Sequence, residues 1–289
     1  MVRYLYRILF KLHFFKHWNV VLTKNTPGRK FKIPVYRDTG YINLFNDHEE
    51  WMTLLLKDLF MLTKGCFFDI GMNVGQTLLK AAAIDENRSY TGFEPNPACF
   101  NYCTRLIELN HLKGFVIYPV GLFNTTGILT LFMDKEYASG ASVLEDFRNN
   151  KARYSIKVNI PVFRGDELIN QKEQELPAII KIDVEGAEYE ALDGLPETLE
   201  KATPFIILEI LPVYSLESAN GQYRKAREIK LLSLLFNLGY KMFRINEKEQ
   251  QLLPLDEIAV HNSMNLTNYL FVHEDKLHLL KKMKHYSFQ

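Results

Sequence analysis

Short apolar runs alternate with helical patterns from about residue 65 onward, and this alternation limits the possible folds more than any other feature of the chain. An apolar run at 66–70 ends in glycines and precedes a helical pattern at 76–83. Further runs at 89–93 and 115–120 flank a second helical pattern at 97–110. Strands that alternate with helices are typical of a parallel sheet covered by helices on both faces. We therefore expect an α/β domain with a Rossmann-like sheet.

The alternation is interrupted once. Two strand-like runs, 127–133 and 156–162, flank a polar loop, which predicts a hairpin-like insertion. With no internal repeat or flexible linker evident, we expect one domain over 41–289, preceded by an N-terminal segment over 1–40. After the insertion, the expected strands are 178–183, 205–210, 240–245 and 269–273, and the expected helices are 189–195 and 223–238.

Charges are segregated along the chain, although the formal net charge is only +1. Nine bases and no acid precede Asp38, and four lysines and no acid follow Asp275. Arg3, Arg7 and Lys11 recur every four residues among apolar side chains, which predicts a basic amphipathic helix. Such a helix either packs on the main domain or a second subunit, or lies on an anionic membrane surface. Its charges rule out a span of the bilayer.

The number and spacing of the three cysteines indicate in which cellular compartment the protein works. They are odd in number and form no CxxC pair, which favours a reducing environment. A secretory signal also fits poorly, because the first residues lack an uninterrupted apolar core. We expect a cytoplasmic protein, peripheral at a membrane if the amphipathic helix binds one.

Acids and glycines gather where the expected strands end. Open parallel sheets bind ligands beyond the carboxyl ends of their strands, where the strand order reverses. Four strands that bring acids to that edge are a more specific signal of a site than any single motif. The residues are Asp69, Gly71, Asn73 and Gly75 at the first strand, Glu94 at the second, Asp183 and Glu185 at the fourth, and Glu209 at the fifth.

The stretch FFDIGMNVGQ, at 67–76, reads as a strand-to-helix turn. Gly71 and Gly75 let the backbone approach a ligand closely, but the third glycine of the pyrophosphate-binding Gly-x-Gly-x-x-Gly pattern is missing. Glu94 lies about 25 residues after Asp69, where a carboxylate can accept two hydrogen bonds from a ribose. These features indicate an adenosine-type ligand without phosphates and with a positive group.

The EPNP stretch at 94–97 also has a structural alternative. Glu94 and Asn96 are able to cap the following helix while the two prolines hold the turn. Beside the glycine turn, we favour cofactor binding for both residues.

Five stretches together resemble one family. FDIGMNVGQ, FEPNP, GLFN before GILTL, IKIDVEGAEYEAL and LEI occur in the order and at roughly the spacing of FkbM-type S-adenosylmethionine-dependent methyltransferases, over about 66–211. The resemblance implies a class I methyltransferase sheet of seven strands, the last antiparallel. It also implies binding of S-adenosylmethionine and methylation of a hydroxyl oxygen on a sugar, glycan or small metabolite. The cofactor turn would comprise Asp69, Gly71, Asn73 and Gly75, and Glu94 would bind the ribose.

A hydroxyl acceptor gains from a general base or a Lewis-acid metal. Asp183 is our first choice as the base, with Glu185 and Glu209 as a second base or as metal ligands. Mg²⁺ or Mn²⁺ would suit such an oxygen site, but no further acid or amide completes a ligand set, so a metal is not favoured. We expect a small-molecule or glycan acceptor and no nucleic-acid partner. A homo-oligomer is compatible with the sequence.

Two other functions are open at this level. A non-catalytic Rossmann-like module acting at a membrane or polyanion surface would account for the segregated charges. An NAD-dependent oxidoreductase would use Glu94 and the glycine turn, but lacks the phosphate fingerprint and a recognisable hydride site.

Overall fold

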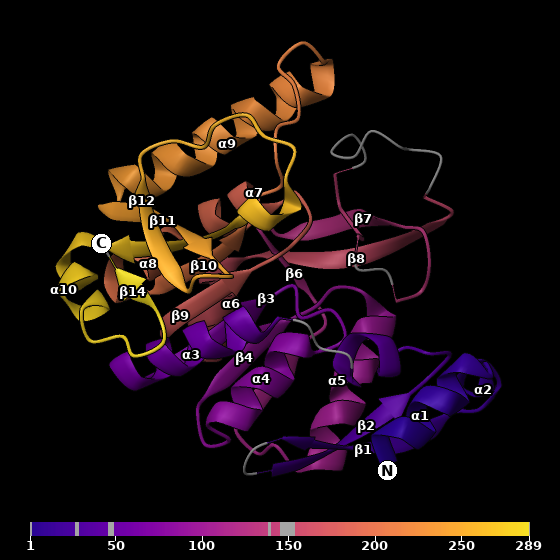
Figure 1. Cartoon of the computed structure of the whole chain (residues 1–289). Coiled ribbons are helices and arrows are strands. Elements are labelled where there is room, and N and C mark those ends of the chain that lie inside the picture. Colours follow the sequence, from indigo (N-terminus) through magenta and orange to yellow (C-terminus); the bar gives the residue numbers. More distant parts are fainter. Residues whose placement is uncertain (1, 27–28, 46–48, 138–139, 145–153, 289) are drawn as a thin grey trace.

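A computed structural model describes residues 2–26, 29–45, 49–137, 140–144 and 154–288 (Figure 1). Its centre is a mixed sheet whose parallel strands follow the alternation expected from the sequence. Strand β13 runs antiparallel to both of its neighbours, β10 and β11, as the family resemblance implies. In sheet order the strands are β14 (Ser287–Phe288), β12 (Gln251–Leu255), β11 (Tyr240–Asn246), β13 (Asn268–His273), β10 (Phe205–Glu209), β9 (Pro177–Ile182), β3 (Cys66–Ile70), β4 (Tyr90–Phe93) and β5 (Phe115–Tyr118).

The sheet is larger than the seven strands expected. Within the described residues it has nine, because β12 folds back on β11 as an antiparallel neighbour and β14 adds in parallel beyond it. Neither strand was predicted, since β12 contains a proline and β14 has only two residues. The seven expected strands form the remainder, so these two additions extend one edge and leave the centre unchanged.

Both faces of the central strands are buried, which explains their continuous apolar composition. Successive side chains of a strand point to opposite faces. Phe67 on β3 therefore belongs to one core cluster and Phe68 to the other, as do Ile179 and Ile180 on β9. Strands buried on both faces read as unbroken apolar runs rather than alternating ones, and this is why the sequence identified them.

Helices cover the two faces in separate groups. The first group packs on the face that carries Phe67 and the second on the face that carries Phe68. The first comprises α3 (Glu50–Leu62), α4 (Gln76–Ile84), α5 (Pro97–Asn110) and α10 (Leu277–Leu280), and the second comprises α6 (Gly165–Lys172), α7 (Glu188–Asp193), α8 (Pro196–Ala202) and α9 (Ala219–Asn237). Short 3-10 turns η3 (Met264–Leu266) and η4 (Glu274–Lys276) flank β13.

The expected hairpin insertion is present. Strands β7 (Gly127–Met133) and β8 (Ile156–Arg164) pair antiparallel, and β6 (Gly121–Phe123) adds in parallel to β8. These three strands form a sheet of their own beside the main one, with a small core that includes Leu131 and Ile160 (Figure 1). In the loop joining β7 to β8, residues 138–139 and 145–153 lie outside the described ranges.

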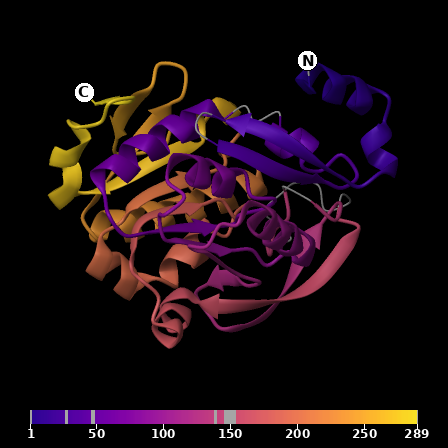
Figure 2. The same cartoon turned by 90° about the horizontal axis from the view of Figure 1, so that it is seen from below.

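The described residues among the first 45 form two α-helices, an antiparallel pair of strands and a π-helical turn. They are α1 (Val2–Lys11), α2 (Phe14–His17), β1 (Val20–Thr26), β2 (Arg29–Val35) and the π-helical turn η1 (Tyr41–Phe45). Figure 2 shows the N-terminal helices and the C-terminal strands at opposite ends of the molecule. No helix in the described ranges has both the length and the apolar character needed to cross a membrane.

Strand β2 packs closely on α5. Asn110 makes two hydrogen bonds with the backbone of Lys32, accepting from its N–H at 2.8 Å and donating to its carbonyl at 2.9 Å. Phe31 and Ile33 of the same strand lie in the main core. The expected boundary at residue 40 stays a prediction, but the hairpin before it shares the core of the domain that follows.

Candidate active site

The glycine turn after β3 presses against the end of β9. Gly71 and Gly75 both have left-handed backbone conformations, with φ of +82° and +86°. A Cβ atom at position 71 would lie 2.0 Å from the carbonyl oxygen of Asp183. Only glycine fits there, because a side chain would collide with backbone that cannot easily move. The turn expected from the sequence is therefore present, and it brings Asn73 to the carboxyl edge of the sheet.

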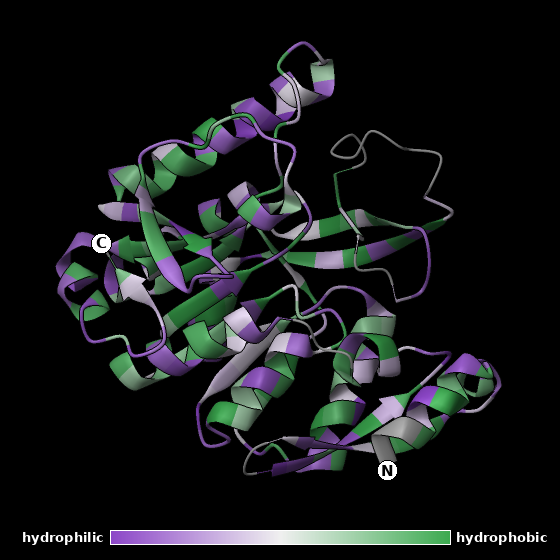
Figure 3. Ribbon diagram, viewed as in Figure 1, coloured by the Kyte–Doolittle hydropathy of each residue, from purple (hydrophilic) through white to green (hydrophobic). Residues whose placement is uncertain are grey.

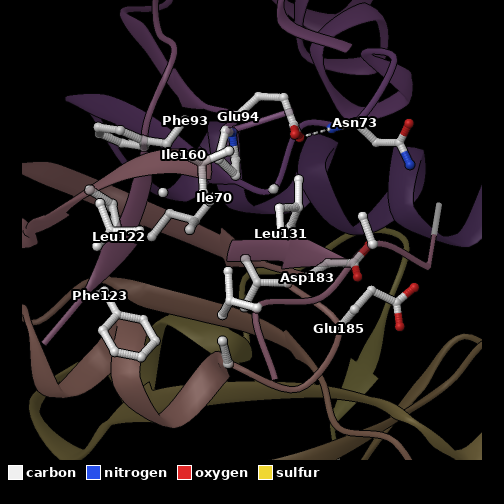
Figure 4. A pocket seen from close by; sticks show the side chains of 18 of the residues that line it. Ile70, Asn73, Phe93, Glu94, Leu122, Phe123, Leu131, Ile160, Asp183 and Glu185 are labelled. Atoms are coloured by element: carbon white, nitrogen blue, oxygen red, sulfur yellow. Dashed lines mark hydrogen bonds between the residues drawn. The ribbon is translucent and has the colours of Figure 1, made fainter. Parts of the chain in front are cut away.

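Glu94, at the end of β4, is held by two backbone amides. Its Oε2 accepts from the N–H of Asn73 at 2.7 Å, and its Oε1 accepts from the N–H of Asn96 at 2.8 Å (Figure 4). Burial raises the pKa of Glu94 to about 7, even though both amides favour the charged form. A carboxylate has roughly four acceptor positions, so two remain for a ligand in the adjoining pocket.

That pocket, here called the Glu94 pocket, encloses about 720 Å³ including the open space at its mouth. Its walls are mostly apolar. Figure 4 shows Leu131 between Glu94 on one side and Asp183 and Glu185 on the other, with Ile160 beside Glu94. Leu131 and Ile160 come from the hairpin insertion, so the second sheet forms a wall of the site. The sequence predicted the insertion but not this role for its inward side chains.

A second pocket, here called the acidic pocket, encloses about 820 Å³ including open space. It shares Gly71, Asn73, Asp183 and Glu185 with the Glu94 pocket, so the two adjoin at the glycine turn. The three acids proposed for catalysis from the sequence, Asp183, Glu185 and Glu209, all line it. Residues that the sequence analysis did not single out complete the lining; they include Glu49, Trp51, Gln76, Thr77 and Asn268.

Lys181 joins the glycine turn to Asp183. Its Nζ donates to the carbonyl of Gly71 at 2.9 Å and lies 3.4 Å from Asp69 Oδ1 and 3.5 Å from Asp183 Oδ2. Burial disfavours the ammonium, but Asp69 and Asp183 outweigh it and raise the pKa of Lys181 above its ordinary value. The lysine therefore stays charged and holds the end of β9 against the turn after β3.

Glu209 lies at the end of β10, facing a concentration of negative charge. Burial, together with Asp183, Glu185 and Glu188, raises the pKa of Glu209 to about 8. Thr267 donates a long hydrogen bond of 3.4 Å to its Oε1. A carboxyl group with such a pKa is able to take up or release a proton near neutral pH.

Three of the residues predicted to bind the cofactor lie behind the pockets rather than on their surfaces. Asp69 is buried, accepts a 2.7 Å hydrogen bond from Tyr90 and supports Lys181. Asn96 caps α5 by accepting from the N–H of Ala98 at 3.0 Å. Gly75 is the N-cap residue of α4. The side chain of Asn96 therefore caps α5, as the structural alternative for the EPNP stretch expected. By contrast, Gly71, Asn73 and Glu94 face the Glu94 pocket.

In the part of the chain that the structure describes, no group of three or more histidine, cysteine or acidic side chains is arranged to hold a metal ion. The acids of the acidic pocket instead face a lysine, and Glu188 is engaged by the N–H of Gly186 at 2.9 Å.

The strand order around β3, the antiparallel β13 and the glycine turn facing an acid on β4 define a class I methyltransferase fold. A family model described as the methyltransferase FkbM domain matches residues 69–242, which is more than half of the chain. The chain belongs to this family.

Two curated relatives are similar over part of their lengths. Hexuronic acid methyltransferase AglP of Haloferax volcanii is 29% identical over 145 residues, which is 50% of this chain and 54% of AglP. Methyltransferase sdnD of Sordaria araneosa is 25% identical over 182 residues, which is 54% of this chain and 68% of that protein. The matched part of the chain therefore spans 54% of the first relative and 68% of the second.

One solved structure bears the same family name. It is the methyltransferase FkbM of Methylobacillus flagellatus KT, with a TM-score of 0.43 and 14% identity over 73% of this chain and 44% of that one.

Proposed function

We propose that this protein transfers the methyl group of S-adenosylmethionine to a hydroxyl oxygen of a sugar, glycan or small metabolite. The observation that carries the proposal is Glu94, pinned by two backbone amides at the point where the Glu94 pocket opens beside the glycine turn. Its free acceptor positions suit a ribose, whose two neighbouring hydroxyls are donors. Membership of the FkbM methyltransferase family supports this choice over a non-catalytic module or an NAD-dependent oxidoreductase.

The two pockets suit the two ends of such a cofactor. The apolar walls formed by Leu122, Leu131 and Ile160 would accept the adenine ring, and the shared edge at Gly71 and Asp183 would accept the charged end. S-adenosylmethionine supplies a methyl group on a positively charged sulfur. The acids around the shared edge favour positive charge there, since opposite charges attract more strongly in a partly dehydrated site.

We propose Asp183 as the general base. It lines both pockets, and the ammonium of Lys181 lies 3.5 Å from its Oδ2, which holds the side chain at the junction. An acceptor hydroxyl in the acidic pocket would release its proton to Asp183, with Glu185 or Glu209 as the second candidate. General-base assistance of this kind contributes roughly 10²–10⁴-fold to a rate.

The lining of the acidic pocket favours a polyhydroxylated acceptor. Gln76, Thr77 and Asn268 offer amide and hydroxyl groups that are able both to donate and to accept hydrogen bonds. The similarity to a hexuronic acid methyltransferase supports a sugar-containing acceptor.

Two measurements test the proposal in order. Calorimetry with S-adenosylhomocysteine should give saturable binding at a single site, and the intact folded protein failing to bind would overturn the proposal. Transfer of a labelled methyl group from S-adenosylmethionine should then be screened against glycans, uronic acids and small hydroxylated metabolites. Base-stable product would support an oxygen-linked ether, whereas label released by mild base would indicate methylation of a carboxylate instead.

A further inference from the structure

Helix α1 leaves large apolar side chains uncovered. Leu5, Ile8 and Leu12 are between 38% and 71% exposed, and Trp18 just after α2 is 62% exposed. The N–H of Leu12 donates to the carbonyl of Ile8, so Leu12 continues the helical spacing. Residues spaced by three and four lie on one side of a helix. Leu5, Ile8 and Leu12 therefore form one exposed apolar stripe, here called the α1 stripe, on the helix at lower right in Figure 3.

The opposite side of α1 is firmly packed on the protein. Phe10 stacks on Tyr41 with ring centroids 4.8 Å apart, and Tyr6 meets Phe45 edge-on at 5.6 Å. The α1 stripe is therefore not the face that holds the helix to the domain. Because the inward face is anchored, the stripe is presented in a defined orientation.

Positive charge borders the α1 stripe. In the sequence, Arg7 and Lys11 fall between the members of the stripe, and Lys16 follows in α2. No acid occurs in the sequence before Asp38, which is itself buried. An exposed apolar stripe with a basic border suits the boundary between headgroups and acyl chains of an anionic bilayer.

We propose that α1 and α2 bind the protein to an anionic lipid surface, with the α1 stripe inserted among the lipids and the bases at the headgroups. The bases near the α1 stripe argue against a second copy of the chain as the partner that buries the stripe. A two-fold contact through this face would bring the same bases together from both subunits, and like charges repel. Trp18 fits the lipid interface, where tryptophan is enriched.

The turn that anchors α1 also lines a hollow beside the candidate site. A hollow next to the acidic pocket is lined by Arg37, Thr39 and Ile42 from the N-terminal region and by Asn73 and Gln76 from the glycine turn and α4. The inference stands independently of the methyl acceptor.

Sedimentation with vesicles tests the proposal on the full chain. The wild type should co-sediment with phosphatidylcholine vesicles that contain about 30% phosphatidylglycerol, and bind pure phosphatidylcholine at least about tenfold more weakly. Raising the salt from about 0.1 M to 0.5 M should weaken binding to the anionic vesicles, because surface charges are then screened.

Variants separate the stripe from general surface hydrophobicity. The triple variant L5Q/I8Q/L12Q keeps good helix formers and should bind anionic vesicles at least about tenfold more weakly. The matched control I128Q/I229Q/V260Q changes three exposed apolar residues on other elements and should bind like the wild type. The variant R7Q/K11Q should lose the preference for anionic over neutral vesicles.

Three results would overturn the proposal: no vesicle binding by the wild type, equal losses in the stripe and control variants, or a dimer in analytical ultracentrifugation that L5Q/I8Q/L12Q converts to monomer. Such a dimer would show that a second copy of the chain, and not a lipid surface, buries the α1 stripe. Binding of S-adenosylhomocysteine, measured on the same preparations, reports the proposed active site separately from the lipid surface.

Discussion

The two pockets that meet at the glycine turn differ in chemistry although they share four residues. The Glu94 pocket has mostly apolar walls, and apart from the shared Asp183 and Glu185 its acid is Glu94, whose two oxygens both accept from backbone amides. The acidic pocket has several acids, and its lysine is shared among the turn, Asp69 and Asp183. We propose that Glu94 recognises the cofactor and that an acid of the acidic pocket takes the proton of the acceptor. The comparison predicts that substitutions in the first pocket change binding and those in the second change turnover.

The largest effect is expected from Asp183→Asn. If Asp183 is the base, kcat for methyl transfer should fall by about 10²–10⁴-fold, a larger change than the rise in the Kd for S-adenosylhomocysteine. The asparagine keeps the shape but cannot take a proton. Steady-state kinetics and calorimetry on the same preparation measure both quantities, with the exposed Asp256→Asn as a control. An unchanged kcat would mean that Glu185 or Glu209, and not Asp183, is the general base.

Lys181→Met should damage both pockets and the fold. The change removes the buried partner of Asp69 and Asp183, and breaking a buried ion pair costs about 3–5 kcal/mol of unfolding free energy. Urea denaturation followed by circular dichroism measures this loss. Lys201→Met, which removes an exposed pair with Glu197, should leave the urea midpoint unchanged. Similar midpoints for the two variants would show that Lys181 does not tie the turn to β9.

Glu94→Gln should weaken binding without slowing saturated turnover. Losing a hydrogen-bonded charged partner costs about 1.5–3 kcal/mol, which corresponds to a Kd for S-adenosylhomocysteine roughly 10–150-fold higher. Calorimetry gives the Kd, and kcat at saturating S-adenosylmethionine should remain within about threefold of the wild type. A large drop in kcat with an unchanged Kd would reverse the assignment of the two pockets.

Acid should weaken cofactor binding through the same carboxyl group. The pKa of Glu94 is about 7, so its charged form declines as the pH falls from 8 through 7 to 6. If only the carboxylate accepts from the ribose, the apparent affinity at pH 6 should be about tenfold lower than at pH 8, in proportion to the ionised fraction. Titrations across this range should lose their slope in Glu94→Gln. A slope that persists in the variant would assign the titration to another group.

Asn96→Ala should produce the smallest change, because its side chain supports the site from behind. Loss of the N-cap of α5 should reduce the unfolding free energy by about 1 kcal/mol. The Kd for S-adenosylhomocysteine should rise far less than in Glu94→Gln, since the backbone N–H of residue 96 still holds Glu94. A Kd as weak as that of Glu94→Gln would mean that the Asn96 side chain reaches the ligand.

Local patterns predicted the centre of the fold well, and they failed at its edges. β3, β9 and β10 were recognisable because burial on both faces demands unbroken apolar runs. The hairpin β1–β2 and helix α3 were not predicted. Their burial depends on partners distant in the sequence. Strand β2, for example, is held on α5 by the hydrogen bonds between Asn110 and the backbone of Lys32. The wall formed by Leu131 and Ile160 was missed for the same reason.

The amino-acid sequence by itself determined the α/β class, the glycine turn, and the acids at the ends of neighbouring strands. These follow from periodicity and from the backbone freedom of glycine, which are properties of short segments. Tertiary structure decided which acids face a ligand. Asp69 and Glu94 look alike in the sequence, but packing buries Asp69 against Tyr90 and Lys181 and turns Glu94 toward the pocket. The difference arises because burial and charge pairing depend on contacts between segments that only the folded chain brings together.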